Sequence, residues 1–230
     1  MVIGKGLVAR NFTRYEPLDE FLIFASGVSN SKTCTPADCL RERALLLSSV
    51  NAYPSRTLVY FSTSSVNDPD LQETPYIAHK LDMEGLIGQM APRYHIFRLS
   101  NLAGASSNPS TILNFFYDSI KEGRPFELWK YSERNIIDVA DVFRISHHIL
   151  ENQLFPNRVV NIANPRNERV TDIVRDIEAF TGKKAVYTEK EKGSAFTIDV
   201  SDILPICRSL QIGFGEDYLP RLLEKYYPRP

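Results

Sequence analysis

The stretch Thr57-Leu58-Val59-Tyr60-Phe61-Ser62-Thr63-Ser64-Ser65 joins an apolar run to a cluster of hydroxyl side chains. The run from Thr57 to Phe61 is short and rich in β-branched and aromatic residues, which is typical of a buried strand. The cluster Ser62–Ser65 then falls at the carboxyl end of that strand. Ligands of open α/β sheets bind at this edge, so the stretch indicates both a fold and a place for a site.

The same arrangement recurs on both sides of this stretch. Further apolar strands are expected at 1–3, 21–25 and 94–99, and small or hydroxyl residues follow them at Gly4–Gly6, Ser26–Ser31 and Ser100–Asn101. Helices are expected between the strands at 36–51, capped by Thr33 or Thr35, and at 76–90. Strands that alternate with helices at this spacing predict an α/β fold with a doubly wound parallel sheet.

Composition excludes several classes of protein. The 230 residues are 43% hydrophobic and carry a net charge of −1, so we expect no nucleic-acid partner. No apolar run approaches the ~20 residues that a membrane-spanning helix needs, and we expect no membrane insertion. The three cysteines, Cys34, Cys39 and Cys207, lack zinc spacing. We therefore expect a reduced cytoplasmic protein without a metal site.

The segment Gly4-Lys5-Gly6-Leu7-Val8-Ala9 has the G-x-G-x-x-A pattern of a turn that approaches a pyrophosphate, opening a helix expected to run to about Tyr15. Gly4, Gly6, Leu7 and Val8 are its candidate cofactor contacts. Ser26 and Gly27 in the next loop are further candidates. Each loop is equally compatible with a plain turn between a strand and a helix.

The segment Pro75-Tyr76-Ile77-Ala78-His79-Lys80 places a tyrosine and a lysine on one face of the expected helix. An ammonium at this position can stabilise a phenolate, which would otherwise form only near pH ~10. A hydroxyl from the Ser62–Ser65 cluster can share the hydrogen bond of the phenol. In isolation such a pair also arises by chance on helix surfaces.

Taken together, these motifs resemble the extended short-chain dehydrogenase/reductase family, whose NAD-dependent epimerases and dehydratases act on nucleotide sugars. The glycine turn, S-T-S-S-V at 62–66, Y-I-A-H-K at 76–80 and R-L-S-N-L-A-G at 98–104 occur in the family's order. Two later segments, R-N-I-I-D-V-A-D-V at 134–142 and V-N-I-A at 160–163, are similar to further family segments. The resemblance covers nearly the whole chain.

The resemblance implies roles for individual residues. Tyr76 would be the general acid/base, Lys80 would lower its pKa and hold the nicotinamide ribose, and Thr63 would bond the substrate oxygen. Ser62 and Ser100 join the implied cofactor contacts, and the implied substrate contacts are Ser64, Asn101 and Arg134. The implied cofactor is NAD or NADP, and the implied partner is a nucleotide-sugar substrate.

Two departures from the family pattern matter. The usual second strand, helix and third strand are missing after the glycine turn, which leaves 1–3 near a sheet edge and removes the acidic ribose ligand. Arg10 and Arg14 can replace part of that site by holding a ribose phosphate, or they are plain surface charges. In addition, Ser64 and Ser65 stand where the family's sugar dehydratases carry an Asp-Glu pair, which argues against dehydration.

We therefore expect an NAD(P)-dependent 4-ketosugar reductase or C4 epimerase. The alternative is a nucleotide-sugar binding protein that kept the fold and lost turnover. We expect a Rossmann-like domain at 1–104 and about 134–165, and a small substrate-binding lobe at about 105–133 and 166–230. Helices 36–51 and 76–90 are apolar on more than one side, so we also expect a homodimer.

Overall fold

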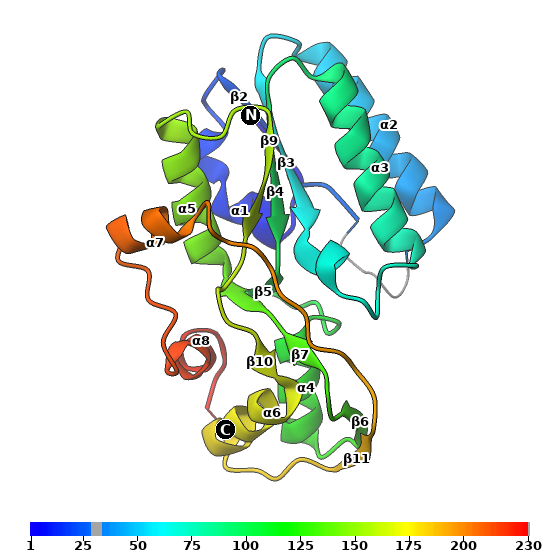
Figure 1. The fold of residues 1–230 in the computed structure, drawn as a ribbon, viewed down its shortest axis with the longest axis vertical. Coiled ribbons are helices and arrows are strands. Elements are labelled where there is room, and N and C mark those ends of the chain that lie inside the picture. Colours follow the sequence, from blue (N-terminus) through cyan, green and yellow to red (C-terminus); the bar gives the residue numbers. More distant parts are fainter. Residues whose placement is uncertain (29–33, 230) are drawn as a thin grey trace.

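The computed structural model describes residues 1–28 and 34–229, and its centre is a parallel sheet (Figure 1). Neighbouring strands are parallel throughout, in the order β1-β2-β3-β4-β9. Their bounds are Val2–Ile3, Phe21–Phe24, Thr57–Thr63, Tyr94–Leu99 and Arg158–Ile162. The predicted fold class is therefore confirmed. The hydroxyl cluster divides between the end of β3 and a short turn of helix at Ser64–Asn67.

Helices cover both faces of this sheet. Figure 1 shows α2 (Pro36–Ala52) and α3 (Pro75–Met90) on one face and α1 (Leu7–Asn11) and α5 (Val139–Glu151) on the other. The side chains of β3 alternate accordingly. Leu58 and Tyr60 join the core on the α2–α3 side, whereas Val59 and Phe61 join the core on the opposite side. Burial on both faces explains why the strand is one continuous apolar run.

The starts of α2 and α3 follow directly from their sequences. Thr35 caps α2 in a reciprocal capping box with Asp38, and a proline occupies the first turn of each helix. Thr74 caps α3 by accepting a hydrogen bond from the Ile77 amide at 3.4 Å. The other predicted cap of α2, Thr33, and residues 29–31 of the predicted loop lie outside the described residues.

The amino-terminal part is as short as the sequence predicts. β1 lies at an edge of the sheet and pairs with β2 alone. Residues 4–20, all of them described, contain α1 and one turn of 3₁₀ helix at Thr13–Tyr15 and no strand. The helix expected from the glycine turn to about Tyr15 is broken at Phe12. The phenyl ring of Phe12 is fully buried against Phe61, and α1 ends to place it there.

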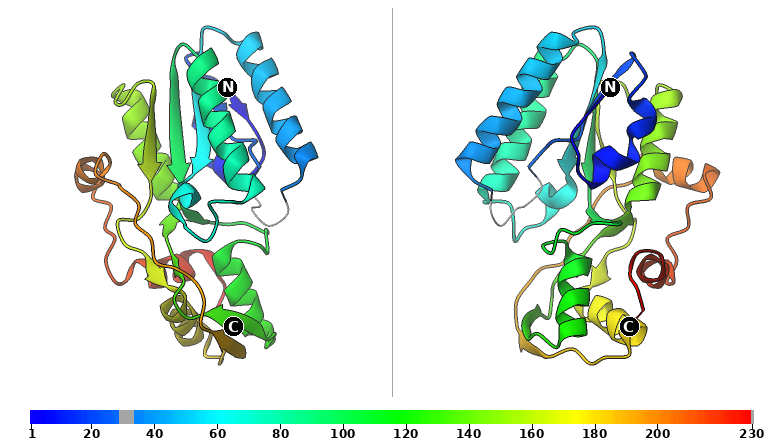
Figure 2. Two further views of the ribbon diagram at one scale, coloured as in Figure 1. Left: turned by 45° about the vertical axis from the view of Figure 1, so that its right-hand side comes forward. Right: turned by 180° about the vertical axis from the view of Figure 1, so that it is seen from behind.

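A second group of elements packs around its own core below the sheet (Figures 1 and 2). It contains α4 (Ile112–Glu122), α6 (Val170–Thr181) and α8 (Tyr218–Tyr226). Two short strand pairs join them, β6 (Phe126–Trp129) with β11 (Tyr187–Lys190) and β7 (Glu133–Arg134) with β10 (Glu168–Arg169). Trp129, the single tryptophan of the chain, lies here with 37% of its surface exposed.

The connections between the two groups run through a third pair of strands, β5 (Asn101–Ala103) and β8 (Ile136–Asp138). Residues 200–212, which include α7 (Leu204–Ser209), pack with the core of the sheet rather than with the second group. Within the described residues, no helix is long and apolar enough to cross a membrane.

Candidate active site

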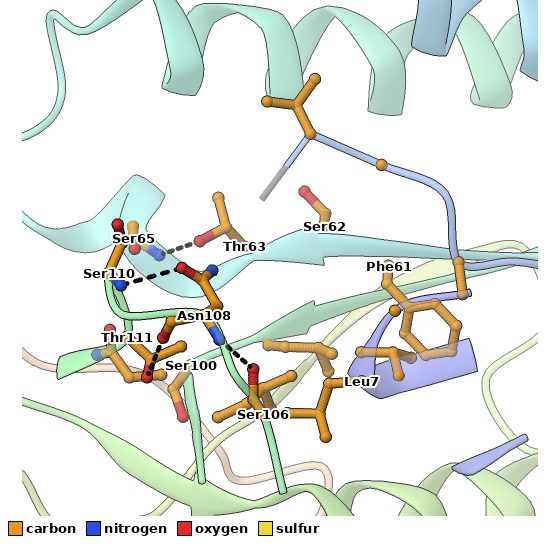
Figure 3. A pocket seen from close by; sticks show the side chains of 18 of the residues that line it. Leu7, Phe61, Ser62, Thr63, Ser65, Ser100, Ser106, Asn108, Ser110 and Thr111 are labelled. Carbon is orange, nitrogen blue, oxygen red and sulfur yellow. Dashed lines mark hydrogen bonds between the residues drawn. The ribbon is translucent and has the colours of Figure 1, made fainter. Parts of the chain in front are cut away.

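A cavity of about 600 Å³ opens at the carboxyl ends of the strands, between the sheet and the second group of elements (Figure 3). Loops after β1, β2, β3 and β4 all contribute to its wall. Most of the residues predicted for the site line this cavity: Gly6, Leu7, Val8, Gly27, Ser62, Thr63, Tyr76, Lys80, Ser100 and Asn101.

Four predicted site residues lie away from the wall. Gly4 has φ +129°, and a Cβ on it would lie 2.3 Å from the Ala25 carbonyl oxygen, so this glycine is required for the turn to pack against β2. The Ser26 carbonyl accepts a hydrogen bond from Arg41 at 3.4 Å. Ser64 is 2% exposed, and its neighbour Ser65 lines the cavity instead. Arg134 pairs with Asp68 at 3.6 Å.

Thr63 and Tyr76 meet at the wall formed by β3 and α3. Thr63 Oγ1 accepts a hydrogen bond from the Ser65 amide at 3.1 Å (Figure 3). Burial raises the pKa of Tyr76 to about 12; a hydrogen bond with the Thr63 side chain lowers it, and the negative charge of Glu42 raises it. The sequence led us to expect a lowered pKa. The difference arises because the phenol is buried, and because the Lys80 ammonium, which lies 6.0 Å from the centre of the Tyr76 ring, is paired with Glu42.

Lys80 lines the cavity but is only 2% exposed, and the partners of its ammonium lie behind the cavity wall. Its Nζ donates to Glu42 Oε1 at 3.1 Å and to the Tyr60 hydroxyl at 3.1 Å. Burial lowers the pKa of Lys80, and the nearby Glu42 carboxylate opposes that shift. The lysine of the predicted tyrosine–lysine pair is therefore also the lysine of a buried ion pair.

Sequence reasoning missed Glu42, which is completely buried in α2. The buried positions of α2 are Glu42, Leu46 and Ser49, which recur at helical spacing, but only the structure shows that this face of the helix is the buried one. An ionisable residue on the core face of a helix is rare unless it is paired. Glu42 therefore marks a buried partner that the sequence alone does not name.

A second buried carboxylate, Glu84, lies one turn beyond Lys80 on α3. Its Oε1 accepts from Ser62 Oγ at 2.5 Å and from Arg98 Nε at 2.9 Å, and its Oε2 accepts from Arg98 Nη2 at 2.6 Å. Tyr76, Lys80 and Glu84 thus follow one another at intervals of four residues along one face of α3. This face fixes the ends of β3 and β4 at the cavity.

The opposite wall is a loop of hydroxyl and amide residues that the sequence analysis also missed. Asn108 organises it: the Asn108 amide donates to Ser106 Oγ at 3.2 Å, and Asn108 Oδ1 accepts from the Ser110 amide at 3.0 Å (Figure 3). The side chain of Asn114 then donates to the carbonyl oxygens of Ser106 and Asn108, both at 2.8 Å. The loop is consequently held in one shape before any ligand is considered.

Among the described residues, no group of three or more His, Cys, Asp or Glu side chains is arranged to hold a metal ion. The side chains at the cavity wall offer a phenol, hydroxyls, amides and cationic groups. These groups can transfer a proton and can bind a polar ligand that carries hydroxyl or phosphate groups.

Comparison with known sequences gives one match. The model of the NAD dependent epimerase/dehydratase family matches residues 32–163, which is more than half of the chain. The match includes β3, α3 and β4, and it leaves out the glycine turn. No curated protein matches the chain.

Solved structures with the same fold are numerous, and three illustrate them. The UDP-glucuronic acid 4-epimerase of Bacillus cereus, in complex with UDP-glucuronic acid and NAD, is 19% identical, with a TM-score of 0.74 over 94% of this chain and 76% of that one. The UDP-glucose 4-epimerase of Thermus thermophilus, in complex with NAD, is 16% identical, with a TM-score of 0.67 over 90% and 77%. RMD from Pseudomonas aeruginosa, complexed with NADPH, is 16% identical, with a TM-score of 0.68 over 85% and 86%.

Proposed function

Because this chain belongs to the NAD dependent epimerase/dehydratase family, we propose that it is an NAD(P)-dependent oxidoreductase acting on a nucleotide-linked sugar. Within that class we propose a 4-ketosugar reductase or a C4 epimerase. The observation that carries the proposal is the meeting of Thr63, Tyr76 and Lys80 at one wall of a cavity that Gly6 and Gly27 also line.

The wall of the cavity fits a dinucleotide. A Cβ on Gly6 would meet no atom within 4 Å, so the backbone there is open to the close approach of a pyrophosphate. Ser100 Oγ is buried at the wall without a hydrogen-bond partner among the described residues, and a ligand hydroxyl would complement it. When bound, NAD or NADP supplies the hydride chemistry, and the protein supplies orientation and a proton.

In this proposal each side chain has one task. Tyr76 gives a proton to a sugar oxygen or takes one from it, and Thr63 bonds the same oxygen. Lys80 holds the cofactor ribose, while its ammonium is paired with Glu42. A dehydration would need a carboxylic acid and a carboxylate beside Thr63, whereas Ser64 and Ser65 follow it. These residues support reduction or epimerisation.

The test is Tyr76→Phe. We expect turnover to fall about 10²–10⁴-fold, because general acid–base catalysis is worth roughly that factor, while nucleotide-sugar binding persists. Turnover is measured with NADH or NADPH across UDP-, dTDP- and GDP-linked sugars and their 4-keto forms. Tyr15→Phe is the matched control, since Tyr15 is a buried tyrosine on the opposite face of the sheet whose hydroxyl bonds His147 at 2.8 Å.

Full activity in the Tyr76→Phe variant would contradict the catalytic assignment. A wild-type protein that binds nucleotide sugars and turns none over would favour the alternative, a binding protein with this fold. The cofactor that copurifies distinguishes the epimerase from the reductase. Tightly bound NAD would favour an epimerase, which recycles its cofactor, whereas an empty site would favour a reductase, which exchanges its cofactor at every turnover.

We also propose that the protein is a homodimer joined through α2 and α3. Leu40 on α2 is 67% exposed and Leu81 on α3 is 44% exposed, so each helix presents an apolar residue on its outer side. Light scattering of the wild type and of the Leu40→Glu/Leu81→Glu variant tests this. A monomeric wild type would contradict it.

A further inference from the structure

The Glu42 carboxylate is a fully buried charge with partners on both of its oxygens. Its Oε1 accepts from the Tyr60 hydroxyl at 2.6 Å and from Lys80 Nζ at 3.1 Å. Its Oε2 accepts from the Val28 amide at 2.6 Å and lies 3.0 Å from His79 Nε2. Burying a carboxylate costs desolvation free energy, and hydrogen bonds and opposite charges on both oxygens offset that cost. A buried charge surrounded in this way is a candidate for a functional role.

We propose that Glu42 is the positioning residue of this site: its carboxylate holds the Lys80 ammonium at the cavity wall beside Gly27. The inference rests on the proposed function, because that function gives Lys80 its task. Glu42 itself does not line the cavity. It acts through the lysine, which does.

Gly27 provides an independent observation of the same contact. A Cβ at this position would lie 2.7 Å from Lys80 Nζ and 3.0 Å from Glu42 Oε1, distances too short for any side chain to fit without displacing the ion pair. The ion pair is therefore pressed against the backbone of the loop that lines the cavity. The hydrogen bond from the Val28 amide ties that loop to the same carboxylate. One group thus sets the position of both the lysine and the loop.

The charge on Glu42 favours positioning over proton transfer. Burial raises its pKa, but Lys80, Tyr60, the Val28 amide and His79 together outweigh burial, and the net pKa is below the ordinary value. A carboxylate that resists protonation is a poor proton carrier and a good fixed counter-ion. Burial lowers the pKa of Lys80, and Glu42 is the group that most opposes this. Glu42 therefore keeps the ammonium charged inside the protein.

Other ionisable groups face this pair and contribute to its titration. They come from β3, from α3, from α2 and from the residues just before α2: Tyr60, Tyr76, His79, Glu84, Cys39 and Cys34. A method that reports on Lys80 alone is needed to separate its charge from theirs.

The experiment measures the protonation of Lys80 directly, by NMR of protein labelled at the lysine side chains, with the Lys80 signal assigned from Lys80→Met. In Glu42→Gln we expect the midpoint of the Lys80 side-chain titration to fall by about 1–3 pH units. An opposite charge at this distance shifts a pKa by roughly that amount. Asp138→Asn is the matched control, because Asp138 is a buried carboxylate paired with Lys225 at 2.7 Å, outside the cavity. It should leave the Lys80 midpoint unchanged.

A Lys80 midpoint that is the same in Glu42→Gln and the wild type would overturn the proposal. If Glu42→Gln does not fold, the double variant Glu42→Gln/Lys80→Met decides: recovery of folding locates the damage in an unpaired ammonium, and continued failure to fold overturns the proposal. Both readings are independent of turnover. Absence of turnover in the wild type with every sugar would contradict the proposed function alone.

Discussion

The two sides of the cavity are built in different ways. On the α2–α3 side, buried charges are fixed in pairs: Glu42 with Lys80, and Glu84 with Arg98. On the α1 side, the wall rests on a glycine turn, a five-residue helix and a two-residue edge strand. An ion pair on that side, Arg14 with Glu151, spans 4.0 Å between side chains that are 67% and 57% exposed.

This difference has a physical consequence for the two halves of the proposed site. A charge pair is worth more where water is excluded, and breaking one is costlier there. The side chains on the wall that carries the proposed proton chemistry are therefore held in place by buried charge pairs. On the wall that would hold the cofactor phosphates, apolar residues such as Phe12 belong to the core but polar residues such as Arg10 are exposed, so changes at those polar residues should alter binding without unfolding the protein.

Removing one arginine from each side gives the largest contrast. Arg98→Met leaves the buried Glu84 without its two-pronged partner, and we expect the free energy of unfolding to fall by about 3 kcal/mol. Arg14→Met removes an exposed pair, and we expect a change below about 0.5 kcal/mol. Urea denaturation of both variants measures this. Equal losses would mean that the two walls do not differ.

Alkaline pH should lower the free energy of unfolding through the ionisation of Tyr76 on α3. Its pKa is raised from 10.0 to about 12, so the stability that this group contributes is complete below pH 10 and is lost as pH rises towards 12. The loss is on the order of 3 kcal/mol, because the pKa differs by about two units from its ordinary value and each unit is worth about 1.4 kcal/mol. Tyr76→Phe lacks this titration, and its unfolding free energy should fall less over the same range. Parallel pH curves for the two proteins would count against a buried phenol.

The two glycines of the cavity should respond differently to alanine. Gly27→Ala places a methyl group 2.7 Å from Lys80 Nζ, and we expect lower stability together with at least a tenfold loss of NAD(P)H affinity, which corresponds to about 1.4 kcal/mol. Gly6→Ala meets no atom within 4 Å, so stability should stay unchanged while cofactor affinity falls. Thermal melting and NAD(P)H fluorescence titration separate the two. Unchanged affinity in Gly6→Ala would place the pyrophosphate elsewhere.

Arg10 should give the smallest effect. It lines the cavity and donates to the Ala105 carbonyl at 2.9 Å, whereas Arg14 does not line it. If Arg10 contacts a ribose phosphate, Arg10→Gln should reduce the preference for NADP over NAD by less than about 1 kcal/mol, as for other exposed charge contacts. The ratio of the two cofactor affinities measures this. A ratio equal to that of the wild type would mean that Arg10 does not contact the ribose phosphate and is a plain surface charge.

The sequence was sufficient for β1, β2 and β3 because each contains a continuous apolar run closed by small or hydroxyl residues. The strand expected at 94–99 also forms with the expected bounds. The helix after the glycine turn was overestimated because the burial of Phe12 ends it, and burial depends on contacts that are distant in the sequence.

The site was predicted only in part, for a related reason. Tyr76, Lys80 and Thr63 belong to short local patterns, whereas Glu42 reaches Lys80 across 38 positions of the chain. Nothing in the neighbourhood of either residue specifies the other. The loop around Asn108 was missed in the same way, because its role depends on facing the sheet across the cavity.

The position of Trp129 makes the second group of elements optically separate from the sheet. It is the only tryptophan in the chain, and it lies in β6 with the Lys192 ammonium 5.9 Å from its ring centre. Tryptophan emission therefore reports on that group alone, whereas far-ultraviolet circular dichroism averages over the whole chain. If the two signals change at different urea concentrations, the parts unfold in sequence; if they coincide, the protein unfolds as one cooperative unit.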